Sequence, residues 1–196
     1  TGISPDITLE DCVFDRNSAP FDAYIYALDS TLNISTCTFK DNISPETGVA
    51  FLEGGSGIFT RCIIYNNICN SVIKSSVNGA HIEIDHATIV NNSCDSPIKF
   101  QGPNLHSFVK NSIIYNNSNS QQVFTGASIE YCNLDTTLAG AGNIEHDPQF
   151  ASPLTGDFRL SSNSPCINAG DPNSNPDPDN SVTDIGALAY DPSVPY

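Results

Sequence analysis

The chain has 196 residues, of which 22 are acidic and 7 are basic, so its formal net charge is −15. A surface this acidic argues against a nucleic-acid partner, because binding of phosphate backbones needs clustered Lys and Arg. No apolar run approaches the roughly 20 residues that cross a bilayer, so membrane insertion is not expected.

A short phrase returns along the chain at a fixed step of 25 residues. Each copy starts with a small residue, continues to a large apolar residue two positions later, and reaches Asn after three more. The five copies occupy residues 12–17, 37–42, 62–67, 87–92 and 112–117, and a weaker sixth follows after a step of 20, near residues 129–134. A period in the range of about 20 to 50 residues is typical of a solenoid, in which neighbouring repeats complete one another.

Polar and apolar residues alternate just before and within each phrase, which predicts a strand with one buried face. The connecting segments hold short apolar runs, such as residues 49–52, that are too short and too β-branched for helices. The sequence therefore predicts an all-β, right-handed, single-stranded parallel β-helix of about six coils over residues 1–141.

Residues 142–196 lack the period and are expected to form an irregular C-terminal cap on the last coil. Four apolar side chains are spaced to cover the open edge of that coil: Phe150, Phe158, Leu160 and Ile167.

The Asn of each phrase forms a column of five residues: Asn17, Asn42, Asn67, Asn92 and Asn117. Asn tolerates left-handed backbone angles at the end of a strand, and stacked amides can hydrogen-bond from coil to coil. We interpret this column as a structural ladder and not as a catalytic feature.

Two groups of cysteines follow the repeat. Cys12, Cys37 and Cys62 share one column with Ala and Ser in later copies, which indicates small core residues. Cys69 and Cys94 also lie 25 residues apart, in the turn after the Asn column. Two interpretations stay open for Cys69 and Cys94: a disulfide between adjacent coils, or a pair of free thiols.

Basic side chains that could bind a ligand lie in two further columns. By spacing alone, the first column holds Tyr24, Val49, Lys74 and Lys99, and the second holds His81 and His106. Cations on successive coils can bind an acidic glycan, and a solvated surface is the alternative. Stacked Asp or Glu pairs, which glycoside hydrolysis needs at about 5 to 9.5 Å, do not occur in the outward columns. No catalytic residue is assigned.

A proline-rich loop near the C-terminus carries oxygen-bearing side chains at alternate positions. They are Asp171, Asn173, Asn175, Asp177 and Asp179, with Asp184 close behind. Calcium takes six to eight oxygen ligands and tolerates irregular geometry, so this loop is a candidate calcium site. A stiff, solvated connector is the alternative, because three prolines interrupt the loop.

Four phrases of the tail carry a resemblance to a known family: residues 143–150, 156–160, 164–171 and 184–187. Together with the repeats, they resemble the C-terminal part of secreted bacterial β-helix proteins of the pectate-lyase-like superfamily, in particular the choice-of-anchor Q group. The resemblance implies export, with the protein attached to the cell surface or released. It implies location better than activity, because that superfamily contains lyases, hydrolases, adhesins and structural proteins.

Two functions from different classes follow. The first is a non-catalytic extracellular module with a structural, adhesive or self-assembling role, whose partner is another copy of itself or an extracellular glycan. The alternative is a protein that binds or degrades polysaccharides. The scarcity of basic and of paired acidic groups favours the first.

Overall fold

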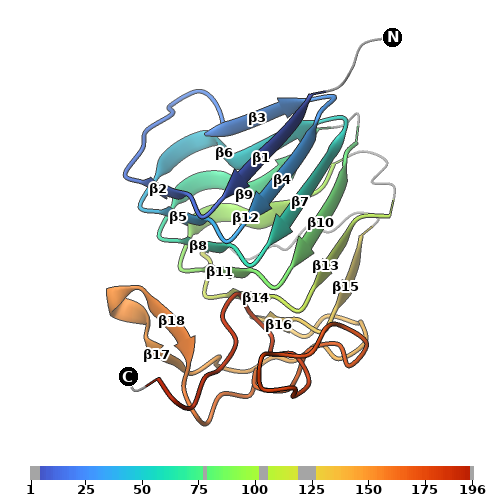
Figure 1. The fold of residues 1–196 in the computed structure, drawn as a ribbon. Coiled ribbons are helices and arrows are strands. Elements are labelled where there is room, and N and C mark those ends of the chain that lie inside the picture. Colours follow the sequence, from blue (N-terminus) through green and yellow to red (C-terminus); the bar gives the residue numbers. More distant parts are fainter. Residues whose placement is uncertain (1–4, 77–78, 102–105, 119–126, 195–196) are drawn as a thin grey trace.

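A computed structural model describes residues 5–76, 79–101, 106–118 and 127–194, and the part described is a parallel β-solenoid (Figure 1). Its first sheet stacks β1 (Asp6–Glu10), β4 (Thr31–Ser35), β7 (Ser56–Thr60), β10 (His81–Asp85), β13 (Phe108–Lys110) and β15 (Ser128–Glu130). Its second sheet stacks β2 (Val13–Asp15), β5 (Thr38–Lys40), β8 (Ile63–Tyr65), β11 (Thr88–Val90), β14 (Ile113–Tyr115) and β16 (Asn133–Leu134). Its third sheet stacks β3 (Ile25–Leu28), β6 (Ile43–Glu53), β9 (Ile68–Ser75) and β12 (Ser93–Lys99).

The strand order confirms the predicted all-β solenoid with a 25-residue period. Thr31 pairs with Asp6 and with Ser56, and this offset of 25 continues down the first sheet as far as β13. The third sheet has four strands, so about four turns are complete on all three sides, fewer than the six expected. The last step is shorter because Val109 pairs with Ile129 at an offset of 20.

The core is a set of stacked inward columns. Phe59 lies between Ile34 and Ile84 in the first sheet, and all three side chains are buried. Cys37 and Cys62 are fully buried in the same core, which is the role expected of small residues in that column.

Single residues with left-handed backbone angles turn the chain at two corners of each coil. The first corner, between the first and second sheets, holds Asp11, Thr36, Arg61, His86, Asn111 and Tyr131. The second corner, between the second and third sheets, holds Arg16, Asp41, Asn66, Asn91 and Asn116. The left-handed angle therefore belongs to the residue before each ladder Asn. The expectation that the ladder Asn itself adopts it was wrong.

The ladder amides connect each coil to the next. The Asn67 Oδ1 accepts hydrogen bonds from the backbone N (3.0 Å) and Nδ2 (2.8 Å) of Asn42. The Asn67 Nδ2 in turn donates to the Asn92 Oδ1 (2.9 Å) and to the carbonyls of Phe39 and Tyr65 (3.0 Å each). These buried amides satisfy backbone groups that the corner leaves without a strand partner.

One irregularity interrupts the register of the third sheet. Ser44 of β6 pairs with Cys69, but Gly48 pairs with Ser71, so β6 holds two extra residues between these pairs. The bulge moves every later residue of β6 two positions relative to β9. Columns read by spacing alone therefore fail beyond this point.

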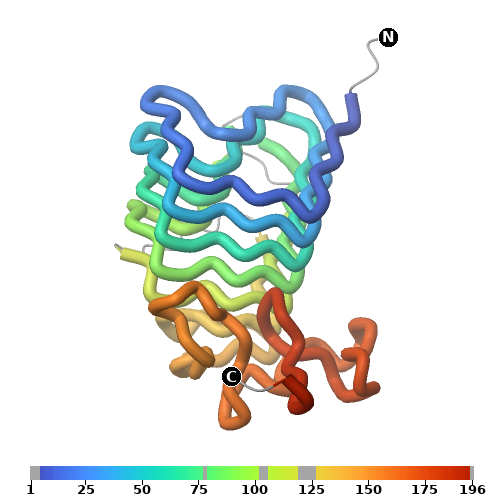
Figure 2. Tube along the Cα trace, turned by 60° about the vertical axis from the view of Figure 1, so that its left-hand side comes forward, coloured from blue at the N-terminus to red at the C-terminus, as the bar shows by residue number. Residues whose placement is uncertain are grey.

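The tail covers the last coil and then runs along the side of the solenoid (Figure 2). Ile144 pairs with Asn133, and the Asn143 Nδ2 donates to the Ile129 carbonyl at 2.9 Å, so the ends of β15 and β16 are covered. Beyond them, β17 (Phe150–Ser152) and β18 (Asp157–Leu160) form an antiparallel ribbon.

The apolar residues of the tail form a second core on the flank of the solenoid. Phe158 and Leu160 pack with Val90 and Ile113, whose side chains point outward from the second sheet. Phe150 and Ile167 are partly buried against the same cluster. The structure thus places these four tail residues beside the second sheet and not over the end of the last coil, where they were expected.

Candidate functional site

The outer face of the third sheet carries a column of two aromatic and two basic side chains. We call it the aromatic–lysine column, and its members in coil order are Tyr26, Phe51, Lys74 and Lys99. The two lysines share one column, as expected, but the prediction that Tyr24 and Val49 continue it was wrong. The β6 bulge places Phe51, and not Val49, opposite Lys74. Tyr24 packs against the core, and Val49 is fully buried.

Contacts between neighbours order this column. The Lys74 ammonium lies 5.4 Å from the centroid of the Phe51 ring, within the range of a cation–π contact. The Tyr26 and Phe51 rings are 5.7 Å apart and tilted by 44°. The Tyr26 hydroxyl donates to the Glu53 Oε2 at 2.6 Å, and this hydrogen bond raises the pKa of Tyr26. The Tyr26 side chain is thus fixed while remaining exposed.

The two ammonium groups make the column a local exception in an acidic protein. Partial burial, and then repulsion from Lys99, lower the pKa of Lys74. Within the described residues, neither lysine forms an ion pair with a carboxylate. Exposed rings bind the apolar face of a sugar, and unpaired ammonium groups bind carboxylates. The column is therefore suited to an acidic glycan.

The two histidines do not join this column. His81 begins β10 in the first sheet, and its Nε2 lies 2.7 Å from the Glu83 Oε1. His106 is exposed in the turn before β13, with a left-handed φ of 62°. These residues belong to a different face of the solenoid from Lys74 and Lys99.

The carboxylates of the proline-rich loop accept hydrogen bonds from the protein itself. The Asp184 side chain accepts from the backbone N of Asn168 (2.7 Å) and of Tyr190 (2.6 Å). The Asp177 Oδ2 accepts from the backbone N of Asp184 at 2.8 Å. Within the described residues, no three His, Cys, Asp or Glu side chains are grouped as metal ligands would be.

The remaining members of the candidate calcium set lie in the same loop. The Asp171 Oδ1 accepts from the backbone N of Asn173 at 2.9 Å, and the Asp179 Oδ1 accepts from the backbone N of Ser181 at 2.9 Å. Asn175 is exposed. These hydrogen bonds order the loop, and a bound calcium ion stays a prediction.

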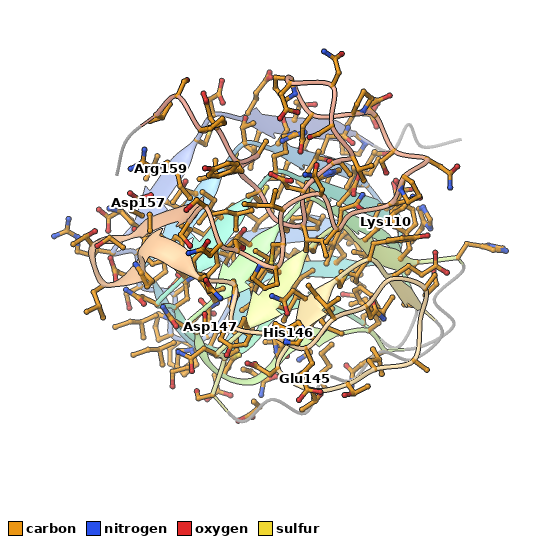
Figure 3. The ribbon with its side chains drawn as sticks, turned by 90° about the horizontal axis from the view of Figure 1, so that it is seen from below. Lys110, Glu145, His146, Asp147, Asp157 and Arg159 are labelled. Atoms are coloured by element: carbon orange, nitrogen blue, oxygen red, sulfur yellow. The ribbon has the colours of Figure 1, made fainter. Side chains whose placement is uncertain are left out.

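Two contacts that the sequence did not predict hold this loop to the solenoid. His86, at the first corner, contacts the Asp85 Oδ1 through Nδ1 (3.0 Å) and the Thr183 Oγ1 through Nε2 (2.7 Å). Lys110 forms an ion pair with Asp171, on the side of the covered end opposite to Arg159 (Figure 3). Sequence spacing carries no signal for these contacts, because Thr183 lies 97 residues from His86.

Cys69 of β9 and Cys94 of β12 are register partners on neighbouring strands, and both are buried free thiols in this structure. The hydrogen bond between the two side chains and their burial raise the pKa of Cys69. Their place on adjacent coils is the one that the spacing predicts.

The repeated strands, the ladder and the flanking tail define the class of this protein as an all-β parallel β-solenoid. Comparison of the sequence with known protein families finds no match, and comparison with curated proteins finds none either. Among the residues described, no helix has the length and apolar character to cross a membrane.

Proposed function

We propose that this protein is a non-catalytic extracellular adhesive module that binds an acidic glycan along the aromatic–lysine column. One observation carries the proposal: Phe51 and Lys74 are in contact, and the column continues through Tyr26 on one side and Lys99 on the other. Parallel coils repeat every 4.8 Å or so, so these side chains form a line of contacts for an extended chain.

Partly buried acid–base pairs elsewhere support a binding role over a catalytic one. His86 with Asp85, and Lys110 with Asp171, join the tail to the solenoid. Their function is accounted for by docking of the tail. The column, in contrast, presents its cations on the outer face of the third sheet, where charge and shape can be recognised together.

The location of the protein is part of the same proposal. The tail phrases that resemble the choice-of-anchor Q group of the pectate-lyase-like superfamily favour a secreted protein, released or attached to a bacterial cell surface. A rigid solenoid with a binding face along its side suits such a place.

Titration calorimetry with polygalacturonate tests the proposal, with a neutral galactan as the comparison glycan. The double variant Lys74→Gln/Lys99→Gln should weaken binding of polygalacturonate at least tenfold, which corresponds to about 1.4 kcal/mol. Phe51→Ala should weaken it several-fold because the stacking surface and the cation–π contact are lost together.

Lys40→Gln is the matched control, because it removes the same charge from the second sheet, where Lys40 pairs with Asp15 at 3.5 Å. It should leave binding unchanged at 0.15 M salt. Equal losses per charge removed in Lys40→Gln and in Lys74→Gln/Lys99→Gln would show that the glycan responds only to net charge. No measurable binding of the unaltered protein would refute the proposed function.

Self-association is a second candidate, motivated by the strand edges of the first coil that have no partner among the described residues. β1, β2 and β3 each have a neighbouring strand on one side only within the described structure, and Val13 of β2 is 66 % exposed. The covered strands β15 and β16 at the other end oppose head-to-tail stacking. Light scattering across a concentration series tests this candidate, and a constant monomeric mass would exclude it.

Calcium is a further proposal for the loop from Asp171 to Asp184. If the loop binds calcium, 1 mM CaCl₂ will raise the midpoint of thermal unfolding and EDTA will reverse the change. An unchanged midpoint would assign these carboxylates to ordering of the loop alone.

A further inference from the structure

A groove of about 390 Å³ lies where the tail meets the outer face of the second sheet. Its volume is within the range of roughly 300 to 1,000 Å³ that is typical of small-molecule sites. The side chains that define it are Thr36, Thr38, Arg61, Ile63, Arg159 and Leu188. These residues are distinct from those of the aromatic–lysine column.

Arg61 is the distinctive group of this groove. It is partly buried at the first corner, and it forms no ion pair within the described residues, although the chain carries 22 acidic side chains. The nearby Arg159 is already held by Asp157, through Nε–Oδ1 (2.9 Å) and Nη2–Oδ2 (2.6 Å). Arg61 is therefore the cation that is available to a ligand.

The walls of the groove define the rest of such a ligand. Its apolar lining consists of Ile63 from the second sheet and a wall of Ala187, Leu188 and Ala189 from the tail. The Ala187 backbone N donates to the Thr88 Oγ1 at 3.0 Å, so this wall is tied to the sheet. A guanidinium beside a fixed apolar surface matches a ligand with one carboxylate and an apolar body.

We propose that this groove binds a small apolar carboxylate, with Arg61 as the group that pairs with the carboxylate. Arg presents parallel N–H donors that match the two oxygens of a carboxylate. The ligand is a free aliphatic acid or the C-terminal end of a peptide, since both offer the same chemistry. The inference does not depend on glycan binding by the column.

The test follows backbone amide chemical shifts of the intact chain during titration with hexanoate and with N-acetyl-leucine. Both probes should produce saturable shifts at Thr38, Arg61 and Ala187. N-acetyl-leucinamide, which lacks the carboxylate, should bind at least tenfold more weakly than N-acetyl-leucine. Tighter binding of N-acetyl-leucine than of hexanoate would identify a peptide end as the source, and the reverse order would identify a free acid.

Arg61→Asn is the informative variant, because Asn adopts the left-handed angle of this corner and already occupies the equivalent position at Asn111. It should reduce affinity for both probes at least tenfold with an unchanged amide spectrum elsewhere. Arg16→Asn is the matched control at the second corner, where φ is 55°, and it should bind normally.

Three outcomes would overturn the proposal. They are binding of the amide probe as tight as that of the acid, retained affinity in Arg61→Asn, and absence of saturable shifts in the groove. Loss of groove binding with intact binding of polygalacturonate would separate this site from the proposed function.

Discussion

Removal of one buried ladder amide should destabilise the solenoid far more than removal of the amide at its end. The Asn67 side chain makes five hydrogen bonds and is fully buried. Asn67→Ala leaves the backbone N–H of Asn42 buried without an acceptor, which costs about 1 to 3 kcal/mol. The three bonds lost by the amide nitrogen bring the total to about 4–6 kcal/mol, because each is worth roughly 1 kcal/mol.

Asn17→Ala is the matched control at the end of the same ladder. Asn17 is exposed, and its amide donates one hydrogen bond, to the Asn42 Oδ1 at 3.0 Å. That acceptor keeps its bond from the backbone N of Asn17 at 2.9 Å. The expected loss is below about 1 kcal/mol, since only one partly solvated bond disappears.

Equilibrium unfolding in urea measures the difference, followed in parallel by far-ultraviolet circular dichroism and tyrosine fluorescence. Coincident transitions by the two probes support a single free energy of unfolding for each variant. A domain whose free energy of unfolding exceeds about 6 kcal/mol, within the ordinary range of about 5–15 kcal/mol, remains folded after the Asn67 substitution. Similar losses in the two variants, or a loss below about 1 kcal/mol in Asn67→Ala, would refute the ladder as a cooperative support between coils.

Three further predictions concern the tail and the thiols. His86→Ala should increase proteolysis of the tail while the solenoid remains resistant, because the bond to the Thr183 hydroxyl is lost; equal sensitivity of tail and solenoid would contradict this. The hydrogen bond from Lys110 holds the pKa of Asp171 below its ordinary 3.8, so this stabilisation is present above pH 3.8 and is lost as pH falls through the lower folded-state pKa. Asp171→Asn should therefore make the docking of the tail, measured by amide exchange, less dependent on pH in the acid range. An unchanged pH dependence would exclude the Lys110–Asp171 pair as its cause. A thiol reagent at pH 8 should modify Cys12 fastest and the other six cysteines only after unfolding, since Cys12 alone is partly exposed, and rapid reaction of several thiols in the folded protein would oppose this.

The repeat allowed most of the solenoid to be predicted from the sequence. A strict 25-residue step places Leu9 over Ile34 and Asn42 over Asn67, and alternation along each strand separates the buried face from the exposed face. Both signals are local or periodic, so one sequence is sufficient to detect them.

Features that break the period could not be predicted in this way. The two extra residues in β6 moved Phe51 next to Lys74; Pro45 and Gly48 indicate a break in the strand, but they do not fix how many residues are inserted. Tail docking depends on contacts such as Thr183 with His86, which lie far apart in the chain. The Arg61 groove also forms only when the tail is in place. Its residues were therefore not recognised as a site.

The left-handed corners carry a further consequence for how stable the solenoid is able to become. Asn and Asp tolerate this backbone conformation better than Thr or Arg, and the second corner has Asn or Asp at four of its five positions. The first corner instead places Thr36, Arg61 and His86 there. Each of these side chains has a specific contact or place: Thr36 donates to Asp11, His86 holds the tail and Arg61 lines the groove.

A redesigned chain with Asn at every first-corner position would relieve backbone strain coil by coil. The same redesign would erase the groove cation and release the tail. Stability and chemistry thus compete along this one edge of the solenoid, whereas the second corner is free to be optimised for stability.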